Sequence, residues 1–193
     1  MKKLFLSILV LGLLLSGNAY ADDIKDFQIE GISVGESILD YYSEDTIKKD
    51  TKEVWPNTTY VQFCSEGNLN DFQYLCFAYL KKDKKYIIHQ LGGETDLSFD
   101  NCLKELRLNV SALEGLFSSA KINTRKRYKH RSDKKKKSIG SDVQFILKDG
   151  SVARVDCTDW SEEITKKKGW TDFFSIQLAT KKFVKWNRTK AFN

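Results

Sequence analysis

The sequence predicts an α+β protein in which helices pack on an antiparallel sheet, arranged as a helix followed by three strands, twice. Short runs rich in β-branched and aromatic residues are separated by polar turns such as Lys148-Asp149-Gly150, which is typical of β-hairpins. One stretch, 99–117, instead repeats apolar residues at spacings of three and four, which is typical of an amphipathic helix. A weak likeness between residues 71–75 and 142–146, each ahead of a Lys-Asp turn, favours tandem units.

The first half is expected to begin with a short strand at 24–29 and a helix that starts at Ser33. Ser33 with Glu36 three residues later matches a capping box, in which the hydroxyl and the carboxylate each accept a backbone N–H of the first turn. Apolar residues then fall on one helical face, and a further helical turn restarts at Ser43. Three strands are expected next, at 58–64, 72–80 and 86–91, the last ended by Gly92-Gly93.

The second half is expected to open with the helix at 99–117, for which Ser98 is the N-cap residue. Residues 121–138 contain few apolar side chains and are predicted to form a long loop. Apolar and polar side chains alternate in 173–179, which indicates a strand with one buried face. Three strands are expected at 142–147, 151–157 and 173–179, and a closing helix at 181–192.

The first 21 residues have the three parts of a secretory signal peptide. Two lysines precede an apolar run at 4–15 that is too short to span a bilayer, and Ala19-Tyr20-Ala21 then provides a small-x-small cleavage site. We therefore expect cleavage between Ala21 and Asp22 and a periplasmic or secreted mature protein without a transmembrane segment. The mature chain, 22–193, is expected to form a single domain. Its two repeat units are expected at 22–97 and 98–193.

Four cysteines follow the predicted leader, and an even number in an exported protein indicates two disulfides. Cys64 ends one predicted strand and Cys76 lies within the next, so a hairpin brings them together. Cys102 lies on the apolar face of the long helix, and Cys157 shares strand parity with apolar neighbours. We therefore expect the pairs Cys64–Cys76 and Cys102–Cys157. The absence of C-x-x-C disfavours a redox site or a zinc ribbon.

Positive charge is concentrated in one segment. The formal net charge is +6, but residues 125–137 alone contain nine basic residues and one acidic residue, and the rest of the mature chain is net −4. Such a segment can neutralise phosphate, sulfate or lipid-headgroup charge, so an anionic envelope or extracellular polymer is an expected partner. Export disfavours nucleic acid, and a merely solvated loop is the alternative. The candidate polyanion-binding residues are Arg125, Lys126, Arg127, Lys129, Arg131, Lys134, Lys135, Lys136 and Lys137.

A second motif, Gly31-Ile32-Ser33-Val34-Gly35, matches the G-x-S-x-G nucleophile elbow of hydrolases. Too few mature residues precede it to build the sheet on which such an elbow sits, and a catalytic serine also needs a base and an orienting acid. The two histidines are His89, in a predicted strand, and His130, in the basic segment. Without a second well-placed histidine we expect no metal site, and we assign no catalytic residue and no cofactor.

The stretches FQIEGISVGESILDYYSEDTIKK, KKYIIHQLGG and CTDWSEEI, together with the leader, resemble a group of small, uncharacterised secreted proteins from marine bacteria. The likeness runs through most of the mature chain. The group carries no known activity, so the resemblance supplies no catalytic residues. The helix-plus-strands repeat is also similar to beta-lactamase inhibitor proteins and small outer-membrane assembly lipoproteins, although this chain lacks their lipid-attachment cysteine. A likeness at the level of fold says little about function.

Three functions remain open at this point. The basic segment favours an exported, non-catalytic binding module whose ligand is a polyanion. The five-residue motif alone favours a small serine hydrolase that uses Ser33. The repeat architecture alone favours a protein inhibitor that binds through a face of its sheet.

Overall fold

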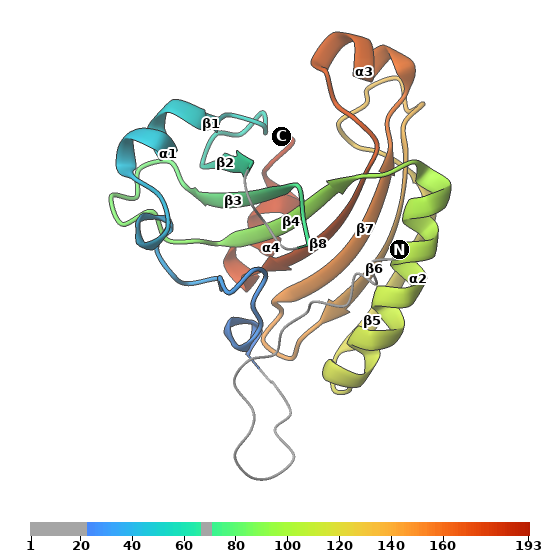
Figure 1. Ribbon diagram of the computed structural model, residues 1–193, viewed down its shortest axis with the longest axis horizontal. Coiled ribbons are helices and arrows are strands. Elements are labelled where there is room, and N and C mark those ends of the chain that lie inside the picture. The colour runs from blue at the N-terminus through green and yellow to red at the C-terminus, as the bar shows by residue number, and fades with distance from the viewer. Residues whose placement is uncertain (1–22, 67–70) are drawn as a thin grey trace.

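The computed structural model describes residues 23–66 and 71–193, and the predicted signal peptide and its cleavage site lie outside them. The described chain forms one eight-stranded antiparallel sheet with the order β1-β2-β3-β4-β8-β7-β6-β5 (Figure 1). The strands are β1 (Thr51–Lys52), β2 (Tyr60–Glu66), β3 (Tyr74–Leu80), β4 (Gln90–Asp96), β5 (Lys121–Lys129), β6 (Ile139–Ile146), β7 (Val152–Asp159) and β8 (Phe173–Ala179). The helices are α1 (Glu44–Asp50), α2 (Phe99–Leu116), α3 (Glu162–Lys168) and α4 (Lys181–Thr189), with short 3₁₀ helices η1 (Ile24–Asp26) and η2 (Ile38–Asp40).

Two four-stranded meanders meet in the middle of this sheet. Strand β4 ends the first meander and pairs with β8, which ends the second, over seven residue pairs from Gln90↔Ala179 to Asp96↔Phe173. The α+β class with helices on an antiparallel sheet is therefore confirmed. The repeat relation between the two halves stays a prediction.

The main core lies on one face of the sheet. Phe77, Leu91 and Val155 point to this face and are fully buried, together with Ile47 of α1. Helix α2 lies over β6, β7 and β8, and the N-terminal segment and α1 cover the first meander (Figure 1). The disulfide between Cys102 of α2 and Cys157 of β7 fixes the helix to the sheet.

A smaller core lies on the opposite face, where α4 packs. Tyr60 and Ala78 point away from the main core and contact Phe183 and Trp186 of α4. Trp55 packs edge-on against both α4 aromatics. The apolar side chains of α4 pack on the β2, β3 and β8 part of this face, and α4 reaches β6 through Arg188, which donates to Gln144 at 3.4 Å. No helix of the described chain packs on the outer part of this face, formed by β5, β6 and β7 (Figure 1).

Most predicted elements are confirmed. The helix at 99–117, the strands of the β6–β7 hairpin and β8 lie within a few residues of their expected bounds. Helix α1 begins where a helical turn was expected to restart, with Ser43 as its N-cap. Both expected disulfides are present, Cys64–Cys76 and Cys102–Cys157. In the part of the chain that the structure describes, no helix is long and apolar enough to cross a membrane.

The N-terminal predictions are wrong. The expected strand at 24–29 is absent: residues 24–26 form η1, and Ile29 forms only an isolated bridge with Ile32. No helix begins at Ser33. Glu36 does accept the Ser33 N–H, at 2.9 Å, but the backbone of this segment pairs with the chain before β4. The Gly35 N–H donates to the Ile88 carbonyl at 2.8 Å, so hydrogen bonds to another segment replace those of a helix.

Strand β4 is displaced relative to the strand predicted at 86–91. It begins at Gln90 rather than 86, and Gly92 and Gly93 lie within it instead of ending it. A Cβ on Gly93 would lie 2.6 Å from the ring of Phe72, so glycine is needed for that ring to pack on the strand. A glycine inside a strand can thus mark a close approach rather than a turn.

Two further elements were not predicted. Residues 121–129, expected in a loop, form the edge strand β5, and α3 lies between β7 and β8. An edge strand with one neighbour has little surface to bury, so it lacks the apolar signature by which strands are recognised. Helix α3 ends at Gly169, whose φ of 69° provides a left-handed C-cap.

Candidate functional site

The basic segment forms the outer strand of the sheet and the turn that follows it. Of its nine candidate residues, eight are exposed, and Arg125 is partly buried. Lys135 is paired with Glu163 of α3 at 2.7 Å, and Arg131 lies 4.4 Å above the ring of Phe192. Arg127 lies 5.6 Å from the ring of Phe99.

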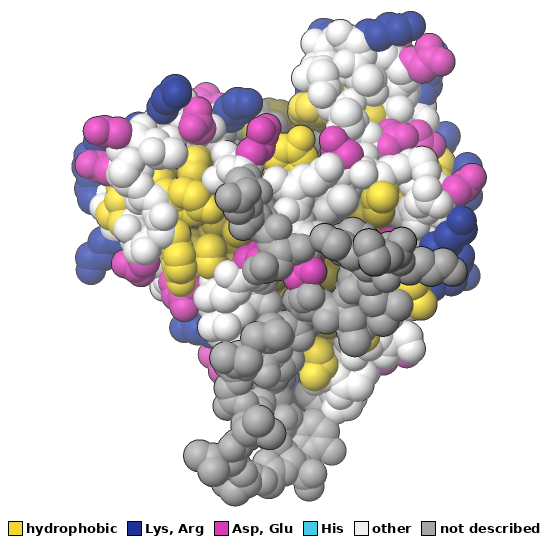
Figure 2. Space-filling model, viewed as in Figure 1, with side chains coloured by type: hydrophobic (Ala, Val, Ile, Leu, Met, Phe, Trp, Pro, Cys, Tyr) yellow, Lys and Arg dark blue, Asp and Glu magenta, His cyan; other side chains and the backbone are white. Residues whose placement is uncertain are grey.

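The other lysines of β5 and of the turn form no ion pair with a residue that the structure describes. We use the name basic edge for the exposed lysines of β5 and the following turn that form no ion pair with a described residue. On the space-filling view, Lys and Arg side chains lie over α3 and along the right-hand side of the molecule (Figure 2). The basic edge comprises Lys121, Lys126, Lys129, Lys134, Lys136 and Lys137.

The turn at 130–138 is held by one buried carboxylate. Asp133 accepts hydrogen bonds from the backbone N–H groups of Lys135, Lys137 and Ser138 at 2.8–3.0 Å. These bonds, chiefly the one from Ser138, hold the pKa of Asp133 far below its usual range. The lysine side chains of the turn therefore extend from an ordered backbone.

An open depression lies beside this turn. It is lined by Lys137, Ser161, Glu162, Glu163, Lys166 and Lys167. Glu163 pairs with Lys135 and Glu162 with Lys166, the latter at 3.3 Å. Both lining carboxylates are therefore paired, whereas Lys137 and Lys167 form no ion pair with a described residue.

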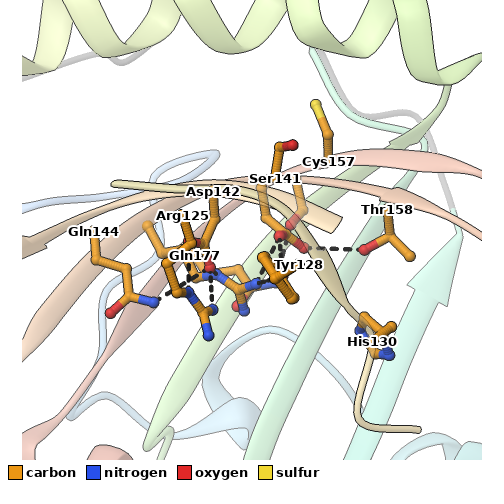
Figure 3. Close-up of polar contacts among 12 residues, drawn as sticks. Arg125, Tyr128, His130, Ser141, Asp142, Gln144, Cys157, Thr158 and Gln177 are labelled. Atoms are coloured by element: carbon orange, nitrogen blue, oxygen red, sulfur yellow. Dashed lines mark hydrogen bonds and ion pairs between the residues drawn. The ribbon is translucent and has the colours of Figure 1, made fainter. Parts of the chain in front are cut away.

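Arg125 belongs to a separate network of charged groups on the helix-free face (Figure 3). Its guanidinium forms two hydrogen bonds with Asp142, whose side chain has no exposed surface. Arg154 of β7 bridges Asp142 at 2.7 Å and Asp156 at 2.6 Å. Tyr128 donates to Asp156 at 3.1 Å and accepts from Arg154 at 2.7 Å. Arg125 is thus a structural partner of this network rather than a free cation.

The sheet register explains how these groups meet. Arg125, Asp142 and Asp156 lie opposite one another on β5, β6 and β7, and the row continues to Ser175 of β8 and Glu94 of β4. Burial, followed by the charges of Asp156 and Asp96, raises the pKa of Glu94 to about 7. This network was not predicted from the sequence, although polar residues at alternate positions of β6 and β7 were a signal for a polar sheet face.

His130 is held in its neutral form. Its ring packs edge-on against Trp160 with centroids 4.3 Å apart, and its Nδ1 accepts the Ser132 N–H at 3.3 Å. Burial, with a smaller effect of the arginines in the network, lowers the pKa of His130 to about 4. A neutral ring whose Nδ1 accepts a hydrogen bond carries its proton on Nε2.

We expect acid to destabilise the protein through His130. The folded-state pKa lies below the ordinary value of about 6.5, so the unfolded chain takes up the proton first. This contribution is fully present above pH 6.5 and is lost as the pH falls towards 4, by at most about 3 kcal/mol. Urea unfolding at several pH values measures it against His130→Asn, which keeps an acceptor but does not titrate. If the stability of both proteins changes with pH in the same way, His130 is not the group that makes the protein sensitive to acid.

Ser33 does not have the surroundings of a nucleophile. Its hydroxyl lies 2.7 Å from the carbonyl oxygens of Lys25 and Phe27, and the residue is buried. A hydroxyl held by backbone carbonyls is not activated, since a base that takes its proton is needed. The histidines lie elsewhere, with His89 beside Thr180 and His130 beside Trp160. This geometry gives the hydrolase hypothesis no support.

Metal-ligand clusters are also absent from the described residues, in which no three His, Cys, Asp or Glu side chains are placed to hold an ion. Comparisons of the chain with protein-family models, with curated proteins and with solved structures found no match.

Proposed function

We propose that the protein is an exported, non-catalytic binding module that holds an anionic polymer of the cell envelope or the extracellular space on its basic edge. The observation that carries this proposal is a row of exposed lysines that form no ion pair within residues 23–66 and 71–193, on an ordered strand and turn. An exposed ammonium group without a paired carboxylate is free to attract an anion. A polyanion that contacts several of them releases condensed counterions, which favours binding at low salt.

The attraction for a polyanion is confined to the basic edge. The mature chain outside the basic segment is net negative, so a polyanion is repelled from most of the molecule. Lys135 is already neutralised by Glu163, and Arg125 by Asp142. Binding therefore depends on fewer cations than the nine that the sequence offers.

Export is part of the proposal and is supported by the two disulfides. Such bonds persist in the periplasm and outside the cell and are rare in the reducing cytosol. The alternative role of edge lysines is to block edge-to-edge association of sheets. The two roles differ in a measurable way, because only the first predicts affinity for a polyanion.

We expect a triple variant, Lys134→Gln/Lys136→Gln/Lys137→Gln, to elute from immobilised heparin at clearly lower salt than the native protein. The slope of log affinity against log salt should fall by about 2 to 3, because each lost contact removes roughly one released counterion. The turn itself should persist, since Asp133 binds backbone groups that glutamine retains.

A matched control separates local charge from total charge. The variant Lys49→Gln/Lys82→Gln/Lys84→Gln removes the same charge from α1 and the β3–β4 connection, on the other half of the sheet. It should elute almost like the native protein. Equal elution of all three proteins, or an equal shift in both variants, would show that the basic edge is not a binding site.

A further inference from the structure

The outer edge of β5 pairs with no other described strand. In the sheet that the described residues form, β5 is terminal, with β6 as its neighbour. Seven of its nine residues are exposed and the other two are partly buried. The opposite edge of the sheet, β1, is only two residues long. A long free edge presents backbone N–H and C=O groups that another strand can pair with.

We propose that this edge accepts an extended acidic segment of a partner protein as a ninth strand. The inference rests on the proposed function and narrows its ligand from a polyanion in general to a polypeptide. Main-chain hydrogen bonds supply affinity in this mode of recognition, and side chains at alternate positions supply specificity.

The geometry of β5 favours pairing along its first half. Residues 121–125 pair with β6 in continuous register, after which the register shifts between Arg125 and Tyr128. At this bulge Arg127 has a φ of 48° and donates its N–H to the Ser141 hydroxyl at 3.0 Å. A bulge twists the strand and ends regular pairing, so the available edge is the segment 121–125.

The charge of β5 determines which strand it accepts. A second copy of this chain, paired through the same edge, would place lysines and arginines of two strands opposite or diagonal to one another, and like charges in those positions repel. Within the available segment, an acidic strand gains an opposite-charge cross-strand pair with Lys121. Beyond the bulge, Lys126 and Lys129 add longer-range attraction for the same acidic segment. The same lysines that block self-association therefore select an acidic partner.

The two faces of the segment also differ. Lys121 and Asn123 lie on the face of the charged network, opposite Ile146 and Gln144 of β6. Ile122 and Thr124 lie on the core face, and Ile122 is 45 % exposed. We therefore expect the added strand to alternate carboxylates on the network face with β-branched or apolar side chains on the core face.

The test uses a capped seven-residue peptide with Glu at odd positions and Thr, Val and Thr at even positions. Two further peptides carry N-methyl groups on the backbone of either the odd or the even residues, which leaves the charge unchanged. In an added strand, the N–H groups of alternate residues point towards β5 and the others point away, so only the odd or only the even residues can donate to β5. Isothermal titration at low salt should show at least a tenfold loss of affinity for one methylated peptide and less than a twofold change for the other.

Amide chemical shifts locate the complex, and the largest changes are expected in residues 121–125. If both methylated peptides bind as tightly as the parent, the peptide is held by charge alone and the added strand is refuted, while heparin binding by the same sample leaves the proposed function intact. If the peptide does not bind but heparin does, the added strand is again refuted. If neither the peptide nor heparin binds, both proposals are refuted.

Discussion

Replacement of Asp142 by asparagine is expected to lower the free energy of unfolding by about 3 kcal/mol, because it breaks a buried charge network. Asp142 accepts hydrogen bonds from Arg125, Arg154 and Gln144, and its side chain has no exposed surface. Burial alone would raise the pKa of Asp142, but Arg125 and Arg154 hold it below its usual value. Asparagine has nearly the same volume without the charge, so Arg154 keeps Asp156 as its only counterion.

Urea unfolding at neutral pH measures this loss, with an exposed ion pair as the control. Glu162 contacts Lys166 at 3.3 Å with both side chains largely exposed, so Glu162→Gln should barely change stability. Similar changes in the two variants would mean that water reaches the network and that Asp142 is not effectively buried.

The elements that the sequence predicted well are those that bury apolar surface. The helix at 99–117 and the strand at 173–179 have to place a full apolar stripe or face against the core, which leaves a clear period in the sequence. The Cys102–Cys157 disulfide could be inferred for the same reason, because both cysteines fall on core-facing positions. The Cys64–Cys76 disulfide could be inferred because its two cysteines lie on neighbouring strands of a hairpin.

The elements that were missed are held mainly by backbone pairing. Strand β5 has no buried face, so nothing in its sequence separates it from a solvated loop. The segment around Ser33 has helix-like spacing, but its hydrogen bonds run to the chain around Ile88, which local patterns do not reveal.

Prediction of the candidate site failed in a similar way. The nine cations of the basic segment were visible as composition, but their division into paired and free groups depends on partners distant in sequence, such as Asp142 and Glu163. The charged network also required the strand order, because its members come from β5, β6 and β7. Charge density can therefore be predicted from sequence, whereas charge that is free to bind a ligand cannot.

Loss of the disulfide between α2 and β7 is expected to cost more stability than loss of the hairpin disulfide. Cys102 and Cys157 are 55 residues apart, and Cys64 and Cys76 are 12 apart. Constraint of the unfolded chain grows with the logarithm of loop length, which gives about 4 kcal/mol for the longer loop and about 3 kcal/mol for the shorter. Both sulfurs of the longer bridge are also buried in the main core, so Cys102→Ala/Cys157→Ala removes packing as well.

Urea unfolding of the two double-alanine variants under non-reducing conditions compares these costs. The Cys64→Ala/Cys76→Ala variant is the matched control, because it also replaces two cysteines but keeps α2 attached to the sheet. Addition of dithiothreitol should bring the stability of the native protein below that of either variant. A larger loss in the hairpin variant would show that α2 is held on the sheet by its apolar contacts and that the bridge contributes little.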